Sequence, residues 1–187
     1  TPARVELDEQ KARTLAKYFR RLPVRLAFLG SEARCMYNAR IPIAIESDTG
    51  LTDATIAHQP LLKRGRVGHE KHASVDYLVA NRRAHFLFAP WGYDLLHLED
   101  HIPLRAVDLD SVSGWILHWD PEMMRALKAR GARFTDFTEE LDGYIAHIDD
   151  VPLEQLKRDY AKFKLYYFDR TPDPKREQRF RRRLEPR

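Results

Sequence analysis

Residues 50–71 have the sequence GLTDATIAHQPLLKRGRVGHEK, in which a helix start is followed by a basic segment. Thr52 or Asp53 predicts the cap of a short helix that continues to about His58. Residues 63–71 then bring together four cations, two glycines and a His-Glu pair. Glycines let backbone N–H groups approach an anion closely, while guanidinium groups supply paired hydrogen bonds. The segment therefore indicates either an anion-binding loop or a solvated, mobile one.

Apolar runs surround this stretch and predict three core strands, Val24–Leu29, Ala39–Ile45 and Ala84–Ala89. Pro42 interrupts the second run, and proline cannot donate to a strand ladder, so this strand lies at an edge or begins at the proline. Asp48 follows the second strand directly, at the end where α/β folds gather ligand groups. Asp48 and Asp53 could bind a cation or sugar hydroxyls, although for Asp53 the sequence favours a helix-start charge.

Helical and extended patterns alternate along the rest of the chain. Further helices are predicted at residues 5–21, 75–82, 120–130, 139–148 and 151–167, and further strands at residues 104–109 and 115–119. We therefore predict a single α/β domain over residues 1–170, with a mostly parallel central sheet, helices on both faces and a helical C-terminal extension.

Residues 171–187 form a basic tail with six arginines and one lysine in KREQRFRRRLEPR. Such a tail could bind nucleic acid or an anionic lipid surface. The sequence favours instead a charged terminal helix packed by Phe180 and Leu184, or a disordered segment. We do not expect nucleic acid as the main partner, and an adaptor for anionic surfaces or nucleic acid that acts through this tail stays an alternative function.

Composition sets wide limits on function. The chain has 187 residues, a net charge of +4 and 43% hydrophobic residues, as expected for a globular protein with a charged surface. Cys35 is the single cysteine, so neither an internal disulfide nor a cysteine-based zinc site is expected, and the cytoplasm stays open as a location. We find no signal peptide, apolar membrane span, Walker loop, GxSxG motif or dinucleotide fingerprint. The sequence therefore leaves open whether the chain is an enzyme.

A histidine pair supplies one catalytic alternative. His97 and His101 stand four residues apart, with Asp94 three residues before His97. On a helix the two imidazoles would share a face, as metal ligands do, and Asp94 would be a third ligand or an acceptor behind them. A small metal-dependent enzyme using these residues is the alternative to surface histidines. Otherwise we expect no cofactor.

The central region resembles the soluble, extracytoplasmic C-terminal domain of bacterial membrane glycosyltransferases that use polyprenyl-phosphate sugars, the arabinofuranosyltransferase-like and mannosyltransferase-like group. The resemblance covers residues 24–90. Its matching residues are Val24–Leu29, Tyr37, Ile45, Asp48, Gly50–Asp53, Ile56, Ala57, Arg64–Arg66, Gly68–Lys71, Tyr77, Leu78 and Phe86–Phe88.

The resemblance implies binding of a glycan or a polyprenyl-phosphate-linked sugar, because the catalytic acid of that group lies in the membrane-embedded part. The residues carried over as ligand contacts are Asp48, Asp53, Arg64, Arg66, His69, Glu70 and Lys71. It further implies a periplasmic or other extracytoplasmic location in the cell envelope, near a membrane surface. Two interpretations stay open, a stand-alone relative and a fragment of a membrane protein.

Overall fold

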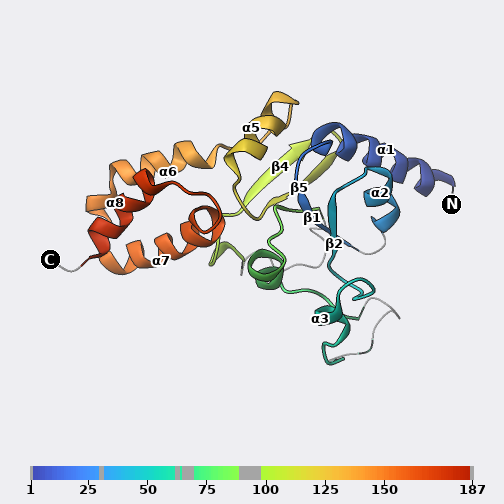
Figure 1. Cartoon of the computed structure of the whole chain (residues 1–187), viewed down its shortest axis with the longest axis horizontal. Coiled ribbons are helices and arrows are strands. Elements are labelled where there is room, and N and C mark those ends of the chain that lie inside the picture. Colours follow the sequence, from blue (N-terminus) through green and yellow to red (C-terminus); the bar gives the residue numbers. More distant parts are fainter. Residues whose placement is uncertain (1, 30–31, 62–63, 65–69, 89–97, 186–187) are drawn as a thin grey trace.

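The computed structural model describes residues 2–29, 32–61, 64, 70–88 and 98–185. Its α-helices are α1 (Pro2–Phe19), α2 (Ala33–Asn38), α3 (Ala54–Ala57), α5 (Pro121–Ala129), α6 (Phe137–Ala146), α7 (Leu153–Phe163) and α8 (Pro174–Leu184). Two short π-helices, η2 (Tyr77–Asn81) and η4 (Lys164–Phe168), and one 3₁₀-helix, η3 (Ile148–Asp150), complete the helical elements that the structure describes. Its strands are β1 (Arg25–Phe28), β2 (Ile43–Glu46), β3 (Phe86–Leu87), β4 (Arg105–Leu109) and β5 (Val112–Ile116). Figure 1 shows the sheet between α1 and α2 on one side and the C-terminal helices on the other.

The described strands form one open sheet in the order β2-β1-β3-β5-β4. β1 pairs in parallel with β2 and with β3, whereas β5 pairs antiparallel with both β3 and β4. The prediction of an α/β fold is confirmed, but the expectation of a mostly parallel sheet is wrong in its second half. The reason is the connection between β4 and β5, which consists of Asp110 and Ser111 alone, and two residues can join only antiparallel strands.

β2 occupies an edge of the sheet and begins at Ile43, directly after Pro42. The proline thus stands outside the ladder, where its missing N–H group costs no strand hydrogen bond. β2 follows β1 through α2, a helix that the sequence analysis did not predict. α2 packs against α1, and a 2.8 Å ion pair joins Lys11 of α1 to Glu32 at its start.

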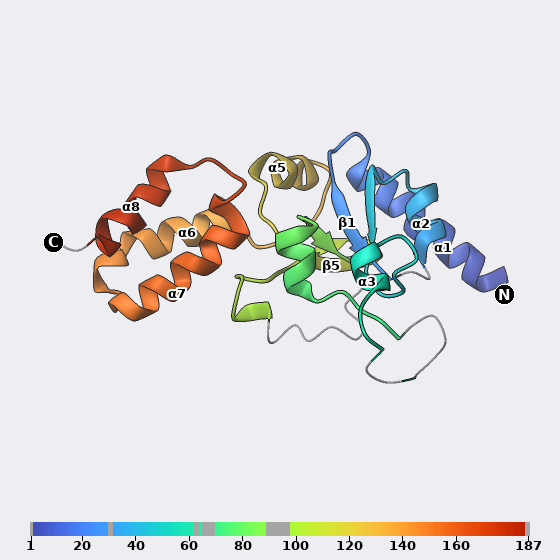
Figure 2. The ribbon, with the colours of Figure 1, turned by 60° about the horizontal axis from the view of Figure 1, so that its bottom comes forward.

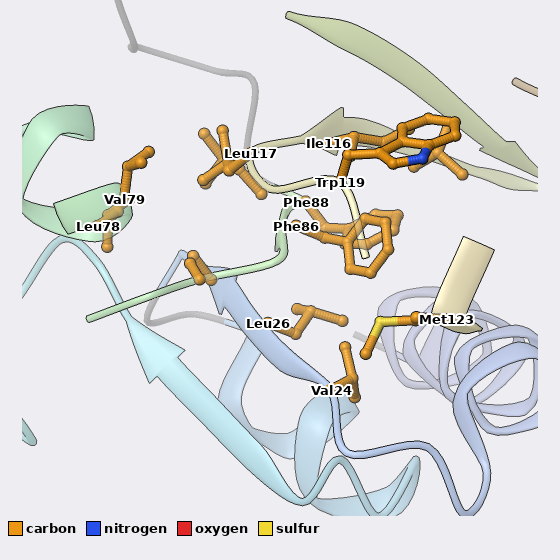
Figure 3. Close-up of a cluster of buried hydrophobic side chains, with 14 of the residues drawn as sticks. Val24, Leu26, Leu78, Val79, Phe86, Phe88, Ile116, Leu117, Trp119 and Met123 are labelled. Carbon is orange, nitrogen blue, oxygen red and sulfur yellow. The ribbon is translucent and has the colours of Figure 1, made fainter. Parts of the chain in front are cut away.

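The core continues on both faces of the sheet. On one face Phe19 of α1 packs against Phe86 and Phe88, with ring centroids 5.2 and 5.9 Å apart. Figure 3 shows Leu78 and Val79 of η2 on the opposite side of β3 from those rings, and Figure 2 shows η2 in front of the sheet. Helical segments therefore cover both faces of the sheet at β3.

The C-terminal helices pack together beside the sheet (Figure 1). α8 contacts α6, α7 and η3, and its Phe180 is fully buried. The Phe180 ring stacks on Tyr144 and on Tyr160, with centroids 5.8 and 5.4 Å away. The predicted terminal helix packed by Phe180 is therefore confirmed.

Candidate functional site

The candidate site lies at the carboxyl ends of β1 and β2, where the chain leaves the sheet. Ser47 follows β2, and its hydroxyl donates to the Phe28 carbonyl oxygen at 2.8 Å. Its own carbonyl oxygen accepts from the Ala73 N–H group at 2.7 Å. These bonds fasten Ala73, which follows the basic segment, to the end of β2.

Glu46 organises the turn that leads from β2 to α3. Its buried carboxylate accepts from the N–H group of Thr49 at 2.9 Å and from that of Thr52 at 3.2 Å. It also accepts from both threonine hydroxyls. One carboxylate thus satisfies four donors, and a buried carboxylate with several hydrogen bonds is far less costly than an unpaired one.

Asp53 caps α3, as the sequence predicts. Its Oδ1 accepts from the N–H groups of Thr55 at 2.9 Å and Ile56 at 3.2 Å. The Tyr77 hydroxyl donates to the same carboxylate at 3.0 Å, and Arg82 forms an ion pair with it. Burial would raise the pKa of Asp53, but the bonds from Ile56 and Tyr77 and the charge of Arg82 outweigh it and hold the pKa below 3.8. Asp53 is therefore an ionised anchor for α3.

The structure gives the other predicted ligand residues different surroundings. Asp48 is buried at 4% exposure beside the end of β2. The Lys71 ammonium group donates to the Ala57 carbonyl oxygen at the end of α3, which directs it toward the protein. Arg64 is exposed and Glu70 is partly exposed. Arg66 and His69 lie outside the described residues.

Asp53 and Lys71 were predicted to contact a ligand. In the structure both side chains contact other residues of the protein. Three functional side chains were not predicted from the sequence: Tyr77 and Arg82 as partners of Asp53, and Glu46 as the centre of the 49–52 turn. Tyr77 and Arg82 are 24 and 29 residues from Asp53, and no local pattern links such positions. For Glu46, a glutamate at a strand end followed by two threonines was the available signal.

Of the predicted metal ligands, Asp94 and His97 lie outside the described residues. His101 is exposed and lies in a turn just before β4. Within the described part of the chain, no group of three or more His, Cys, Asp or Glu side chains is arranged to hold a metal ion. The metal site stays a prediction.

Cys35 of α2 does not contribute a nucleophile at this edge. It is buried, and burial together with the charge of Glu32 raises the pKa of its thiol to about 11. A thiol with such a pKa stays protonated at neutral pH and is unreactive. What this edge of the sheet supplies chemically is two hydrogen-bonded carboxylates, Glu46 and Asp53, that order the turn and the helix after β2.

Comparisons with protein-family models, curated proteins and solved structures found no match to this chain. Among the helices that the structure describes, none has the length and apolar character to cross a membrane.

Proposed function

We propose that this chain is a binding module without catalytic activity of its own, and that its basic segment, residues 63–71, binds the phosphate of a phosphorylated sugar. The observation that supports this most directly is the fastening of the segment's C-terminal flank. Lys71 donates to the Ala57 carbonyl oxygen and Ala73 to the Ser47 carbonyl oxygen. A binding loop held by a rigid scaffold loses less conformational entropy when a ligand binds.

The charges in the segment favour an oxyanion. Lys63, Arg64 and Arg66 stand within four positions of one another, and the Arg64 side chain is exposed. Guanidinium groups bind phosphate through two parallel hydrogen bonds, which makes arginine better suited to this task than lysine. The sugar part of the ligand is supported by the resemblance to polyprenyl-phosphate-sugar glycosyltransferases.

The proposed roles divide the predicted residues into two groups. Arg64, Arg66, His69 and Glu70 contact the ligand. Asp53 and Lys71 hold the frame, since both make internal contacts. Asp48, which is buried two residues after the end of β2, belongs to the frame as well.

The experiment is isothermal titration of the protein with glucose 1-phosphate, inorganic phosphate and free glucose, and flotation with vesicles that carry polyprenyl phosphate. The double variant Arg64→Gln/Arg66→Gln should weaken binding of the phosphorylated probes about tenfold or more, because each charge-assisted hydrogen bond contributes roughly 1.5–3 kcal/mol. The matched control is Arg125→Gln/Arg158→Gln, which removes two exposed arginines from α5 and α7. Equal affinity of the wild type and the first variant would end the proposal.

A second candidate function rests on a different surface, an open groove of ≈ 1040 Å³ beside α8. Its cationic lining consists of Lys157, Arg179, Arg182 and Arg183, and Leu153 and Leu184 add apolar surface. This combination of cations and leucines suits an anionic lipid surface. Asp149 and Glu185, which also line the groove, offset part of the positive charge.

Truncation of α8 cannot test this adaptor function, because it would also remove the buried Phe180. The appropriate variant is Arg179→Gln/Arg182→Gln, in which the two exposed cations are neutralised and the helix is kept. It should reduce salt-sensitive binding to vesicles with anionic lipid and leave binding to glucose 1-phosphate unchanged. If vesicle binding is unaffected, the groove has no such role.

A further inference from the structure

Arg170 lies two residues after the end of η4, in the segment that leads to α8. Both terminal nitrogens of its guanidinium group, Nη1 and Nη2, are buried and have no hydrogen-bond partner among the residues that the structure describes. Buried polar groups in native proteins are nearly always paired, and a buried charge without a partner is especially costly. The position therefore calls for a group that accepts hydrogen bonds and carries negative charge.

The charges nearest to Arg170 add to its own. Burial is the main cause that lowers the pKa of Arg170, to about 10, and the positive charges of Arg83 and Arg25 lower it further. Arg25 begins β1, and Arg83 lies in the turn before β3, where its side chain is exposed. The positive charges of two arginines from distant parts of the chain thus act on the Arg170 guanidinium group.

Two neutral histidines complete this group. The rings of His85 and His118 have centroids 5.6 Å apart. Burial and the charge of Arg170 lower the pKa of His85 to about 4 and that of His118 to about 3, so both are uncharged at neutral pH.

The hydrogen bonds of the two rings define their tautomers. Nδ1 of His85 accepts from the Arg25 N–H group at 3.0 Å, so its proton is on Nε2. Nδ1 of His118 donates to the Tyr166 carbonyl oxygen at 2.7 Å. The Nε2–H group of His85 is therefore a further neutral donor in this group.

The acidic residues around Arg170 do not balance its cations. Asp120 is the carboxylate that raises the pKa of Arg170 most, but it caps α5 by accepting from the N–H groups of Glu122 and Met123. Asp169 is paired with Lys164 at 3.2 Å. Three guanidinium groups and Asp120 leave an excess of two positive charges, which matches a divalent oxyanion.

We propose that Arg25, Arg83, His85 and Arg170 form a binding site for a phosphate-type dianion, either inorganic phosphate or the terminal phosphate of a phosphomonoester. These four residues and His118, whose ring packs against His85 and donates to the Tyr166 carbonyl oxygen, are called the Arg170 cluster. The two unpaired nitrogens of Arg170 form a fork that fits two oxygens of such a group. Water could pair with the N–H groups but would not neutralise the excess charge.

This site is distinct from the basic segment. Arg25 stands at the first residue of β1, whereas Phe28, to which Ser47 is bonded, stands at the last. The Arg170 cluster also joins two parts of the protein, because Arg25 and His85 belong to the sheet region and Arg170 follows the C-terminal helix α7. A bound dianion would therefore stabilise the contact between the sheet and the C-terminal helices.

The first experiment is titration of the full chain with inorganic phosphate and with glucose 1-phosphate, with acetate as a monovalent comparison. Affinity is measured by calorimetry, and the imidazole nitrogens of His85 and His118 are followed by NMR. Phosphate should bind more tightly than acetate and shift both histidine signals. The phosphomonoester arm shows whether the site also accepts a phosphate attached to a sugar.

Arg170→Gln should weaken phosphate binding at this site about tenfold or more, as expected for loss of a charge-assisted pair. Arg83→Gln removes an exposed side chain, keeps the fold intact and should weaken it by a smaller factor. Arg125→Gln on α5 is the control and should leave affinity unchanged. The double variant Arg64→Gln/Arg66→Gln should keep the phosphate-induced shifts of His85 and His118, which separates this site from the basic segment.

Two results would overturn the proposal. One is a wild-type protein in which phosphate leaves the histidine signals unmoved. The other is a phosphate affinity and histidine shifts in both Arg170→Gln and Arg83→Gln that equal those of the wild type. This result would mean that the Arg170 guanidinium group is simply hydrated.

Discussion

At the scale of single residues, Gly50 shows how closely the turn after β2 approaches α3. Its φ of +75° lies in the left-handed region, and an added Cβ would stand 2.7 Å from the Ala57 nitrogen. We expect Gly50→Ala to lower the free energy of unfolding by about 1–3 kcal/mol, because it adds backbone strain and a contact with main-chain atoms that cannot move aside.

The matched control is Gly143→Ala. Gly143 lies within α6, and an added Cβ would have no neighbour within 4 Å. This change should leave stability unaltered or raise it by up to about 1 kcal/mol, since alanine favours helix. Urea denaturation of both variants measures the difference, and a Gly50→Ala protein as stable as the wild type would contradict the close approach.

Asp53 predicts a defined dependence of stability on pH. Because its pKa is lowered in the folded protein, the ionised carboxylate adds stability that is complete above the ordinary pKa of 3.8 and is lost as the pH falls through the folded-state value. Asp53→Asn keeps a capping oxygen but removes the charge opposite Arg82. It should lower the free energy of unfolding at pH 7 by on the order of 1–3 kcal/mol.

Denaturant titrations at pH 7, 4 and 3 test this, since the difference between wild type and Asp53→Asn should shrink with acid. Arg82→Met provides the second arm: without its cationic partner, the pKa of Asp53 should rise toward 3.8, so that acid unfolding begins at a higher pH. A pH-independent difference between wild type and Asp53→Asn would show that its charge does not contribute.

At the scale of elements, the sequence predicts best where one local feature determines the structure. Pro42 correctly predicted the edge position of β2, and Asp53 correctly predicted the start of α3. Each residue acts through its own backbone or through its nearest neighbours in the sequence. The antiparallel half of the sheet was missed because the strand expected at residues 115–119 in fact covers Val112–Ile116. Because the start of this strand was predicted three residues too late, the two-residue connection between β4 and β5, which requires antiparallel pairing, was not recognised.

The candidate site follows the same pattern. The cap at Asp53 is a local property, and it was predicted. The ion pair of Asp53 with Arg82 and the approach of Lys71 to Ala57 arise from the packing of η2 and α3 against the sheet edge. Charged residues near a glycine look alike in sequence whether they face a ligand or a main-chain carbonyl group, so their roles depend on the tertiary structure.

α8 offers the clearest test of an element held by one side chain. Phe180 is fully buried and contacts Tyr144, Tyr160, Phe163 and Phe168. Phe180→Ala should cost about 3–5 kcal/mol, the usual range for removing a buried phenyl ring. Thermal unfolding followed by near-ultraviolet circular dichroism reports on the surrounding tyrosines.

The control for that change is Arg179→Ala, which alters the exposed neighbour and should shift the unfolding temperature little. If Phe180→Ala were as stable as Arg179→Ala, the charged face of α8 rather than its aromatic side chain would hold the helix in place.

At the scale of the whole molecule, the sheet and the C-terminal helices meet at residues 118 and 119. The Trp119 N–H group donates to the Tyr166 carbonyl oxygen at 2.9 Å, and Nδ1 of His118 donates to the same oxygen. Nδ1 of His85, on the turn into β3, accepts a hydrogen bond from the backbone N–H group of Arg25. The junction between the two parts of the protein therefore depends on two imidazoles that stay neutral.

That dependence predicts acid sensitivity of the whole fold. Both histidines have pKa values below 6.5, at about 4 for His85 and about 3 for His118, mainly through burial and the charge of Arg170, with further contributions from Arg83, and Asp120 opposing at His85. Their neutral forms add stability that is complete above pH 6.5 and is lost as the pH falls toward 4. In this range the histidines of the unfolded chain bind protons more readily than those of the folded chain, so acid favours unfolding. In a buffer without phosphate, the wild type should lose on the order of 3 kcal/mol for each histidine over this range. The double variant His85→Asn/His118→Asn keeps polar groups near both Nδ1 positions and should show a much flatter profile in urea titrations at pH 7, 5.5 and 4. Parallel profiles for the two proteins would mean that the histidines titrate normally and that the junction tolerates their charge.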